Sequence, residues 1–509
     1  MKAFNKIFFG ILFVAVAGTT FVSAQSRHYS SRSIGMGGGG TAYVDGYHAN
    51  FINPANLMIN STKRRPKRSL GLVGGVGLRT GGSLINLDVY SEYFTTGLTI
   101  EGQVAENMLN DLFGGSDQNL TRDFSTAVSI VPFGFSNRGK KSAVSLASRV
   151  RVTKDFNINR GFAALGVYGL DPEQFGSQTP VNFSFGATAF SEISLGYSRE
   201  LLSLPDLLFA KNVKLYVGVA PKYLMGHFNS SIDFNSTLLM QQRQVGNEQV
   251  TESIIHDFEY SLNSMGVLAQ DLRAYEAAYN LDNSVELDSY LVNESEYAGV
   301  YATGFGLDMG ATLEMDISGV PIIDGFFGKK KTLRVSMAIT DIGKLSFDDT
   351  PTSLTASGRF EFSGAGNEDD DIGDFYNQLA DSLQQDVYGD FDAEDRDPLV
   401  YELPAMYNFG ASLTMGKLTT SVDLGFGFNE SGTNAKNAAL NLGLEYRFLG
   451  LVPLRFGTRM GGYSSTVYSA GAGIDLNFLE LSFGASVVGK DKENGGSVAT
   501  AFSGLVLRF

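Results

Sequence analysis

The chain of 509 residues has no cysteine and only four histidines. The absence of cysteine excludes a disulfide framework and the lipid-modified cysteine of a lipoprotein. The histidines stand apart in the sequence, at His28, His48, His227 and His256. They do not form the HExxH spacing of a zinc site, so we expect neither a metal nor another cofactor. There is no GxSxG elbow and no serine or carboxylate at a recognisable spacing from a histidine, which predicts that the protein is not an enzyme.

Basic residues are in the minority. The chain has 39 Lys and Arg against 54 Asp and Glu, a net charge of −15. This balance argues against a nucleic-acid partner. The densest basic stretch is TKRRPKRS, which contains Lys63, Arg64, Arg65, Lys67 and Arg68. Two interpretations stay open for it: contact with lipid phosphates or a periplasmic partner, or simple solvation.

The hydrophobic run near the start, Ile7–Ala17, is too short for a membrane-spanning helix, which takes about 20 residues. Two lysines precede it and small residues follow it. Residues 1–24 are therefore predicted to be a signal peptide that is cleaved after Ala24. We expect an exported protein in the outer membrane of a Gram-negative cell.

Glycine and aromatic residues are abundant, with 60 Gly, 38 Phe and 22 Tyr, yet the mean hydropathy is only −0.02. A transmembrane β-barrel has such a composition because only every second residue faces lipid. In ALNLGLEYRF (439–448), large apolar residues alternate with small or polar ones. A soluble β-sandwich also alternates. The export signal and the ending SGLVLRF favour the barrel, because a terminal Phe509 resembles the signal read by the barrel-assembly machinery.

The alternation predicts an all-β, transmembrane outer-membrane barrel of about fourteen antiparallel strands within residues 69–509. An even number returns both ends of the chain to the periplasm. The predicted strands are Ser69–Thr80, Ser125–Ser136, Lys141–Val152, Val181–Arg199, Lys211–Met225, Val300–Asp316, Lys331–Ile342, Pro404–Met415, Leu418–Asn429, Lys436–Phe448, Pro453–Tyr463, Thr466–Phe478, Leu479–Val488 and Ser497–Phe509.

The long connections all fall on the extracellular side, at residues 81–124, 153–180, 226–299 and 343–403. Within the first, Ser83–Phe94 alternates and is either an extra strand or a strand extension. Two others show helical spacing. The apolar positions are Leu268, Leu272, Tyr275 and Tyr279, and then Phe375, Leu379 and Leu383. The acidic loop 368–397 is solvated or binds calcium through Asp390, Asp392, Glu394 and Asp397, although it lacks the glycine of an EF-hand loop.

The faces that point into the barrel carry both signs of charge. Arg455 and Arg459 suggest either part of an ion-pair ladder across the lumen or a contact for an anionic substrate. The lumen-facing candidates are Asp308, Glu314, Arg334, Asp423, Glu445, Arg447, Arg455, Arg459 and Asp475.

The stretch IGMGGGGTAYVDGYHANFINPANLM (34–58) has the Gly35-x-Gly37-x-x-Gly40 spacing of a dinucleotide-binding loop. That loop must follow a buried strand and open a helix. Here only a short polar stretch separates the signal peptide from Ile34, and the sequence after Gly40 is typical of a turn. A nucleotide site is therefore excluded.

The same stretch resembles the N-terminal signature of the long-chain fatty-acid transporter (FadL) superfamily. The matching positions are Gly35, Gly37 and Gly38 with Met36, then Thr41-Ala42, Asp45, and Asn53-Pro54-Ala55. The resemblance implies a fourteen-stranded barrel in which residues 25–68 form a hatch that plugs the lumen. Small residues suit a segment threaded through a crowded lumen, and Pro54 favours an extended Asn53.

A closer likeness is to a FadL-like family of unknown function in gliding, type 9-secreting bacteria. It rests on GFGLDMGATLEMD followed by LRVSMAITDIGKLSF. The superfamily implies passive transport of hydrophobic small molecules across the outer membrane. The alternative is a structural or secretion-associated, PorV-like barrel that acts through protein partners. The expected partners are outer-membrane lipid, the assembly machinery, and a hydrophobic ligand or a secretion-system protein.

Overall fold

The structure is a computed structural model of the whole chain. It describes residues 30–60, 67–168 without 96 and 98, 178–279 without 208, 209, 246 and 247, and 281, 285, 289 and 299–318. It also describes residues 330–347, 352–363, 394–395, 400–428, 437–462, 466–488 without 477, and 495–509. The predicted signal peptide, the second helical pattern (Phe375, Leu379 and Leu383) and most of the acidic loop lie outside these residues.

Fourteen strand positions form a closed antiparallel ring, so the predicted fold and strand number are confirmed. Each strand pairs with the next along the ring, and β1 closes it by pairing with β2 on one edge and with β19 and β20 on the other. The ring consists of β1 (Arg68–Gly82), β2 (Thr121–Arg138), β3 (Ser142–Asn159), β5 (Phe183–Leu207), β6 (Ala210–Val245), β8 (Ala302–Asp316), β9 (Lys331–Phe347), β13 (Met406–Met415), β14 (Leu418–Gly427), β15 (Ala439–Phe448), β16 (Val452–Gly461), β17 (Val467–Asp475), β18 (Leu479–Val488), and β19 (Gly496–Phe502) with β20 (Leu505–Arg508) in the last position.

The barrel is apolar outside and polar inside, the reverse of a soluble protein. Each of eight strands exposes at least one large apolar side chain: Leu146, Leu195, Tyr223, Met337, Phe409, Leu444, Phe456 and Phe483. Each of eight strands also buries a charged side chain inside: Arg149, Glu192, Lys222, Asp308, Arg334, Asp423, Glu445 and Arg455. A continuous apolar outer belt of this kind faces lipid. In the described part of the chain, no helix has the length and apolar character needed to cross a membrane.

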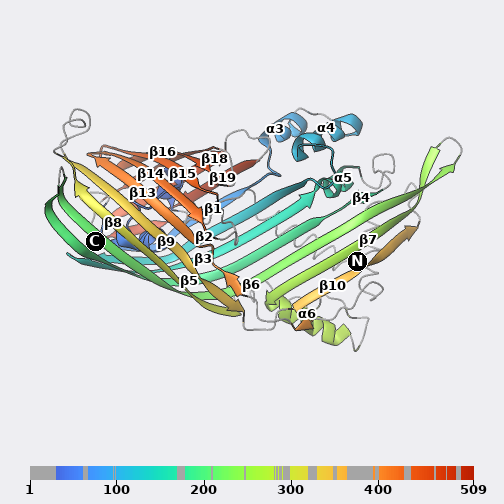
Figure 1. Ribbon diagram of the computed structural model, residues 1–509, viewed down its shortest axis with the longest axis horizontal. Helices are drawn as coiled ribbons and strands as arrows, with labels where there is room; N and C mark the ends of the chain where they lie inside the picture. The colour runs from blue at the N-terminus through green and yellow to red at the C-terminus, as the bar shows by residue number, and fades with distance from the viewer. Residues whose placement is uncertain are drawn as a thin grey trace.

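The long connections add structure beyond the ring. Figure 1 shows β6, β7 and β10 continuing past the other strands, with α3, α4 and α5 gathered near that end. The predicted helix around Leu268 is present as α6. The added elements are α3 (Leu87–Val89), the π-helix η3 (Tyr90–Phe94), α4 (Gly102–Phe113), α5 (Arg160–Tyr168), β4 (Thr179–Pro180), β7 (Glu248–Gly266), α6 (Val267–Tyr279), β10 (Thr352–Ser363), β11 (Glu394–Asp395) and β12 (Val400–Glu402).

The structure corrects one strand interpretation. Residues 87–94 form α3 and η3 rather than an extra strand or a strand extension. The Asn86 side chain accepts hydrogen bonds from the backbone of Asp88 and Val89, which starts the helix. Val89 and Tyr93, four residues apart, then pack against α4 and α5 in one apolar cluster. In residues 87–94, the apolar residues at helical spacing therefore determine the structure, and the two-residue alternation does not.

The N-terminal segment, residues 30–60, lies inside the ring. It contains α2 (Ser31–Gly35), η1 (Gly46–Phe51) and η2 (Pro54–Leu57), and nearly all of its side chains are buried. Backbone passes so close to the wall that a Cβ at Gly37 would lie 2.7 Å from the Thr458 carbonyl oxygen. Gly37 also has a φ of +86°. Both conditions require glycine at this position.

Candidate functional site: the occupied lumen

Polar contacts hold the start of the N-terminal segment to the barrel wall. Arg32 donates two hydrogen bonds of 3.0 Å to the two carboxylate oxygens of Glu445, and a third of 2.7 Å to the Tyr43 carbonyl. The Ser31 and Ser482 hydroxyls are 2.6 Å apart. Asp423 accepts a bond of 2.8 Å from the Thr41 backbone N–H. The glycine-rich stretch thus places backbone donors against a wall carboxylate.

The Asn-Pro-Ala stretch anchors the other end of the segment. The Asn53 side chain accepts a hydrogen bond of 3.1 Å from the Ala55 N–H, which caps η2, and Pro54 occupies its first turn. The Asn53 amide donates to the Thr41 carbonyl at 2.8 Å and to the Thr312 hydroxyl on β8 at 3.0 Å. One asparagine therefore joins both halves of the segment to the wall.

A first group of buried charges, the Glu445 cluster, lies on α2, β15 to β18 and β20. Glu445 accepts from Arg455 at 2.8 Å and from Arg447 at 3.2 Å in addition to Arg32. Asp475 accepts from Arg447 and Arg508 at 2.5 Å each, and Arg508 also pairs with Glu480. The cluster consists of Arg32, Arg447, Arg455, Arg508, Glu445, Asp475 and Glu480, so guanidinium groups outnumber carboxylates by one.

A second group, the Asp341 cluster, lies on β3, β5, β6, β8 and β9. Asp341 accepts from Lys222 at 2.6 Å, from Arg151 at 3.0 Å and from Arg149 at 3.3 Å. Lys222 also pairs with Asp308 at 2.8 Å, and Glu192 pairs with Arg149. The members are Arg149, Arg151, Lys222, Glu192, Asp308 and Asp341, so the charges balance.

A β-bulge builds the Asp341 cluster. The register between β8 and β9 shifts between Leu307 and Met309, and Asp341 has a φ of +57°. Its backbone N–H then donates to Asp308 at 2.6 Å. A non-glycine residue keeps such a conformation where surrounding contacts fix it, and Lys222, Arg149, Arg151 and Asp308 provide these contacts for Asp341. The Phe51 ring of the N-terminal segment lies beneath the cluster, with the Arg149 guanidinium carbon 4.4 Å from its centroid.

An apolar cluster follows the Asp341 cluster along the lumen. The Arg151 guanidinium carbon lies 5.0 Å from the centroid of the Phe190 ring, which joins the two clusters. The members of the apolar cluster are Phe190, Leu224, Met265, Ala302, Leu345, Phe347 and Leu403. The lumen is therefore filled in layers by the N-terminal segment, then charges, then apolar side chains.

The wall itself is interrupted where the N-terminal segment meets β1. The register between β1 and β2 shifts between Leu72 and Gly75, and β19 and β20 are separated at the same level, since Leu72 pairs with Leu505 and Val76 with Phe502. The next pair, β2 with β3, shifts between residues 130 and 134. Three neighbouring strand positions are thus irregular at one height of the barrel.

Tyr47 of the N-terminal segment fills this interruption. Its hydroxyl donates to the Gly74 carbonyl at 2.8 Å, and the side chain is buried. Glycines from β1 and β2 make the slot, because a Cβ at Gly71 or Gly134 would overlap the tyrosine. Outside the wall, Val73 is 57% exposed at a φ of +52°, which is strained for a β-branched residue.

A separate polar contact ties α4 to α5 outside the membrane-spanning strands. Glu106 accepts from Arg160 at 2.7 Å and from the Tyr168 hydroxyl at 3.0 Å. Burial raises the pKa of Glu106, but these hydrogen bonds and the Arg160 charge outweigh it, so the pKa lies below its usual 4.5. Burial and the bond to Glu106 raise the pKa of Tyr168 to about 12.

The lumen-facing candidates lie as follows. Glu445, Arg447, Arg455 and Asp475 meet in the Glu445 cluster, and Asp308 belongs to the Asp341 cluster. Arg334 pairs with Glu314 at 2.7 Å and donates to the Asn60 carbonyl. Arg459 is half-buried on β16 opposite Asn441. Phe509 is exposed, and its backbone pairs with Arg68.

Sequence reasoning missed most of the Asp341 cluster and three members of the Glu445 cluster. The missed residues are Arg32, Arg149, Arg151, Glu192, Lys222, Asp341, Glu480 and Arg508. Alternation in SRVRV (148–152) and in SEISLGYS (191–198) was the available signal for Arg149, Arg151 and Glu192. Asp341 gave no such signal, because the bulge at β9 changes the alternation there.

These features define the chain as a transmembrane β-barrel with an occupied lumen. The chain belongs to a family of unknown function, DUF5723, whose model matches residues 60–486. The resemblance of GFGLDMGATLEMD and LRVSMAITDIGKLSF to a family of unknown function agrees with this match. Among curated proteins, none matches the chain in sequence.

Solved structures with a similar fold include toluene transporters and a hydrocarbon channel. The toluene transporter TbuX of Ralstonia pickettii is 14% identical, with 95% of this chain and 99% of that chain covered and a TM-score of 0.43. The toluene transporter TodX of Pseudomonas putida is 11% identical, with 96% and 98% covered and a TM-score of 0.42. The monoaromatic hydrocarbon channel CymD is 13% identical, with 96% and 99% covered and a TM-score of 0.41. At these values the similarities carry no functional argument.

Proposed function

We propose that the protein is an outer-membrane barrel for passive transport of hydrophobic small molecules, with residues 30–60 as its hatch. The observation that carries the proposal is the interrupted wall at β1, filled by Tyr47. A gap in a barrel wall leads from the lumen to lipid, where an apolar cargo is soluble and a polar one is not. Leu72, Val73 and Leu505 line its outer side with exposed apolar groups.

The contacts of the hatch suit a part that moves. Hydrogen bonds and ion pairs join it to the wall through Arg32, Thr41 and Asn53, and water can replace these partners when the hatch shifts. Inside, the buried side chains of the apolar cluster around Phe190 give the lumen an apolar section.

The test is uptake of a hydrophobic fluorescent dye by liposomes that contain the purified protein. Replacing Tyr47→Ala should empty the slot between Gly71 and Gly134 and raise the rate of uptake. Tyr90→Ala is the matched control, since Tyr90 is exposed on η3, outside the barrel. Equal rates for Y47A, Y90A and the parent protein would contradict the proposal.

A second candidate is a structural or secretion-associated barrel that acts through protein partners. Two observations favour it: the lumen is filled by side chains, and β6, β7 and β10 project beyond the ring (Figure 1). Isolation of the tagged protein from outer membranes in mild detergent, followed by mass spectrometry of proteins and lipids, separates the two. A stoichiometric protein partner favours this candidate, whereas an enriched apolar ligand on a lone barrel favours transport.

A further inference from the structure

Exposed basic side chains gather at one end of the barrel. This end carries the short turns and the C-terminus, and it lies on the left of Figure 1, opposite α4, β7 and β10. The even number of strands puts it on the periplasmic side. Among its described residues, Asp206 is the one exposed carboxylate. Its exposed basic residues, called the basic rim, are Lys67, Arg68, Lys140, Lys141, Arg199, Lys211, Lys330 and Lys417.

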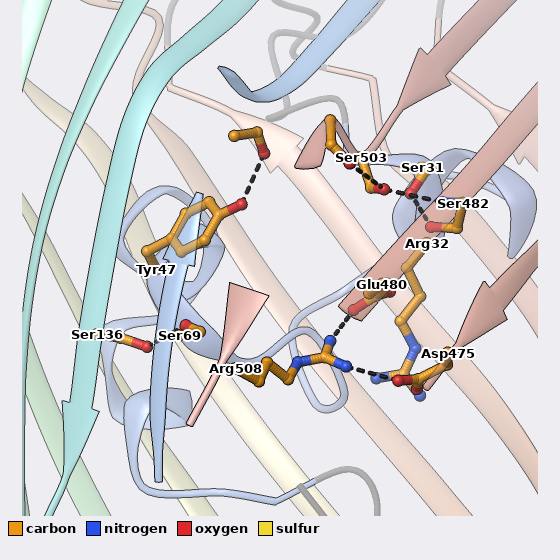
Figure 2. Close-up of polar contacts among 12 residues, drawn as sticks. Ser31, Arg32, Tyr47, Ser69, Ser136, Asp475, Glu480, Ser482, Ser503 and Arg508 are labelled. Atoms are coloured by element: carbon orange, nitrogen blue, oxygen red, sulfur yellow. Dashed lines mark hydrogen bonds and ion pairs between the residues drawn. The ribbon is translucent and has the colours of Figure 1, made fainter. Parts of the chain in front are cut away.

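The charges of the basic rim are balanced less well than those inside the barrel. In the lumen of the same end, Arg508 lies between Asp475 and Glu480 and pairs with both, as Figure 2 shows. On the rim, Lys211 is opposite Asp206 in the register of β5 and β6. The rim residues that form no ion pair with a described residue are Lys67, Arg68, Lys140, Lys141, Arg199 and Lys417. The uncompensated positive charge of this end is therefore on its outer surface.

The basic rim continues the rows of side chains that face lipid. On β5, exposed Leu195 and Tyr197 alternate with buried residues, and exposed Arg199 is the next position of that row. On β1, the outer row runs from exposed Leu72 to exposed Arg68. An apolar row that ends in an aromatic or a basic residue is typical of the level where acyl chains meet headgroups.

Neighbouring strands bring several rim residues together. Lys141 adjoins Arg199, because the Lys141 carbonyl accepts a hydrogen bond of 2.9 Å from the N–H of Glu200. Lys67 adjoins the turn between β2 and β3, because its carbonyl accepts one of 2.9 Å from Arg138. Adjacent strands are about 4.8 Å apart, less than the screening length of about 8 Å in physiological salt. The positive charges on β1, β3 and β5 therefore act together on an anion.

The other part of this end is apolar. Within 448–452 and 476–479, the turns of β15 to β18, no described residue carries a charge. Exposed apolar side chains there and at the C-terminus are Phe448, Leu449, Leu451, Phe478 and Phe509. Large apolar groups at turns suit lipid better than water. The periplasmic end thus combines apolar groups with cations, which match the acyl chains and the phosphates of a phospholipid layer.

We propose that the basic rim binds phospholipids with anionic headgroups in the periplasmic leaflet and concentrates them beside β1, β3 and β5. A lipid is the partner that fits, because the rim residues continue lipid-facing rows and lie at the boundary of the membrane. Each basic side chain near such a surface favours an anionic lipid about fivefold. The inference does not rest on the transport proposal, since it concerns the outer face of the barrel.

The test uses tryptophan fluorescence, because the chain has no tryptophan of its own. Tyr197→Trp places a reporter two positions from Arg199 on the lipid-facing row. The full-length protein is placed in bilayers of phosphatidylcholine that contain either brominated phosphatidylglycerol or brominated phosphatidylcholine as the quencher. Phosphatidylglycerol should associate at least fivefold more strongly at this reporter. Tyr468→Trp is the control reporter, because Tyr468 is exposed on β17 at the opposite end of the barrel, and it should show no preference.

Two substitutions then assign the preference to the rim. Lys141→Gln with Arg199→Gln, in the Y197W protein, should bring the preference close to one, and high salt should lower it in Y197W itself. Both positions are exposed and have no ion pair to lose, so the variant should fold. Lys344→Gln, an exposed lysine at the other end of β9, should change nothing. Equal quenching by the two lipids in Y197W would overturn the proposal. A preference that K141Q/R199Q leaves unchanged, or one of equal size in Y468W, would also overturn it.

Discussion

At the scale of single residues, Tyr47 shows how glycine serves this barrel. Gly71 and Gly134 lie on neighbouring strands, and their missing side chains create the space that the tyrosine ring fills. A larger residue at either position would displace Tyr47 from the wall. The glycines of β1 and β2 therefore provide room for the aromatic ring, in addition to the flexibility that glycine gives a backbone.

Replacing Gly134→Ala should destabilise the protein by about 1–3 kcal/mol, because its methyl group overlaps Tyr47. Gly166→Ala should act in the opposite direction by about 0.5–1 kcal/mol, because Gly166 lies in α5 with open space around its Cβ. Urea unfolding of the purified proteins measures both. Equal effects of G134A and G166A would show that Tyr47 is not held in this slot.

Glu445 is the residue on which the first charge cluster depends. Glu445→Gln removes the negative charge that Arg32, Arg447 and Arg455 share and leaves three buried guanidinium groups under-compensated. The expected loss of stability is about 3–5 kcal/mol, seen as a lower urea midpoint. Glu101→Gln, at an exposed position before α4, should stay within about 0.5 kcal/mol of the parent. If the urea midpoint of E445Q were as high as that of E101Q, the stability of the protein would not depend on the charge of Glu445.

At the scale of elements, the contact between α4 and α5 should depend on pH. The pKa of Glu106 is lowered in the folded protein, so its stabilising contribution is fully present above the unfolded value of 4.5. That contribution is lost as the pH falls through the folded pKa. Acid should therefore separate α4 from α5 while the barrel, held by its strand pairing, stays folded.

Fluorescence can follow this separation, because the chain has no tryptophan. A Phe162→Trp variant places one reporter on α5, where Phe162 packs against the cluster shared with α4. Its emission should shift at a pH below 4.5 in the parent background. In a Glu106→Gln background the acid transition should disappear. A transition of equal size in both backgrounds would assign the acid effect to another group.

The elements also show where sequence reasoning is reliable. In β15 the alternation separates exposed Leu444 and Tyr446 from buried Glu445 and Arg447, because a two-residue period determines which face each side chain takes. The two-residue period does not predict which side chains are buried at bulges and in long connections. Asp341 sits on a bulge, and residues 87–94 alternate by chance but fold as helices because Val89 and Tyr93 gain an apolar partner in α4.

At the scale of the whole molecule, fourteen strands and their antiparallel order follow from alternation and from the parity of short and long connections. The contents of the lumen do not follow in the same way. The Asp341 cluster draws on β3, β5, β6, β8 and β9, five consecutive positions of the ring, and the curvature of the barrel brings the arginines of β3 within reach of Asp341 on β9. A single sequence contains no signal for such pairings.

The central claim is that residues 30–60 act as a movable hatch in a transport barrel. Because the chain has no cysteine, Ser31→Cys with Ser482→Cys introduces one disulfide at hydroxyls that are now 2.6 Å apart. The segment continues into β1 at Arg68, so this bond tethers both of its ends.

The decisive measurement is dye uptake by liposomes containing the S31C/S482C protein, before and after reduction, with each single-cysteine variant as a control. We expect uptake to fall to the level of protein-free liposomes when the disulfide is formed and to return when it is reduced. Full uptake by the oxidised protein would contradict the account, because transport would then not require the hatch to move.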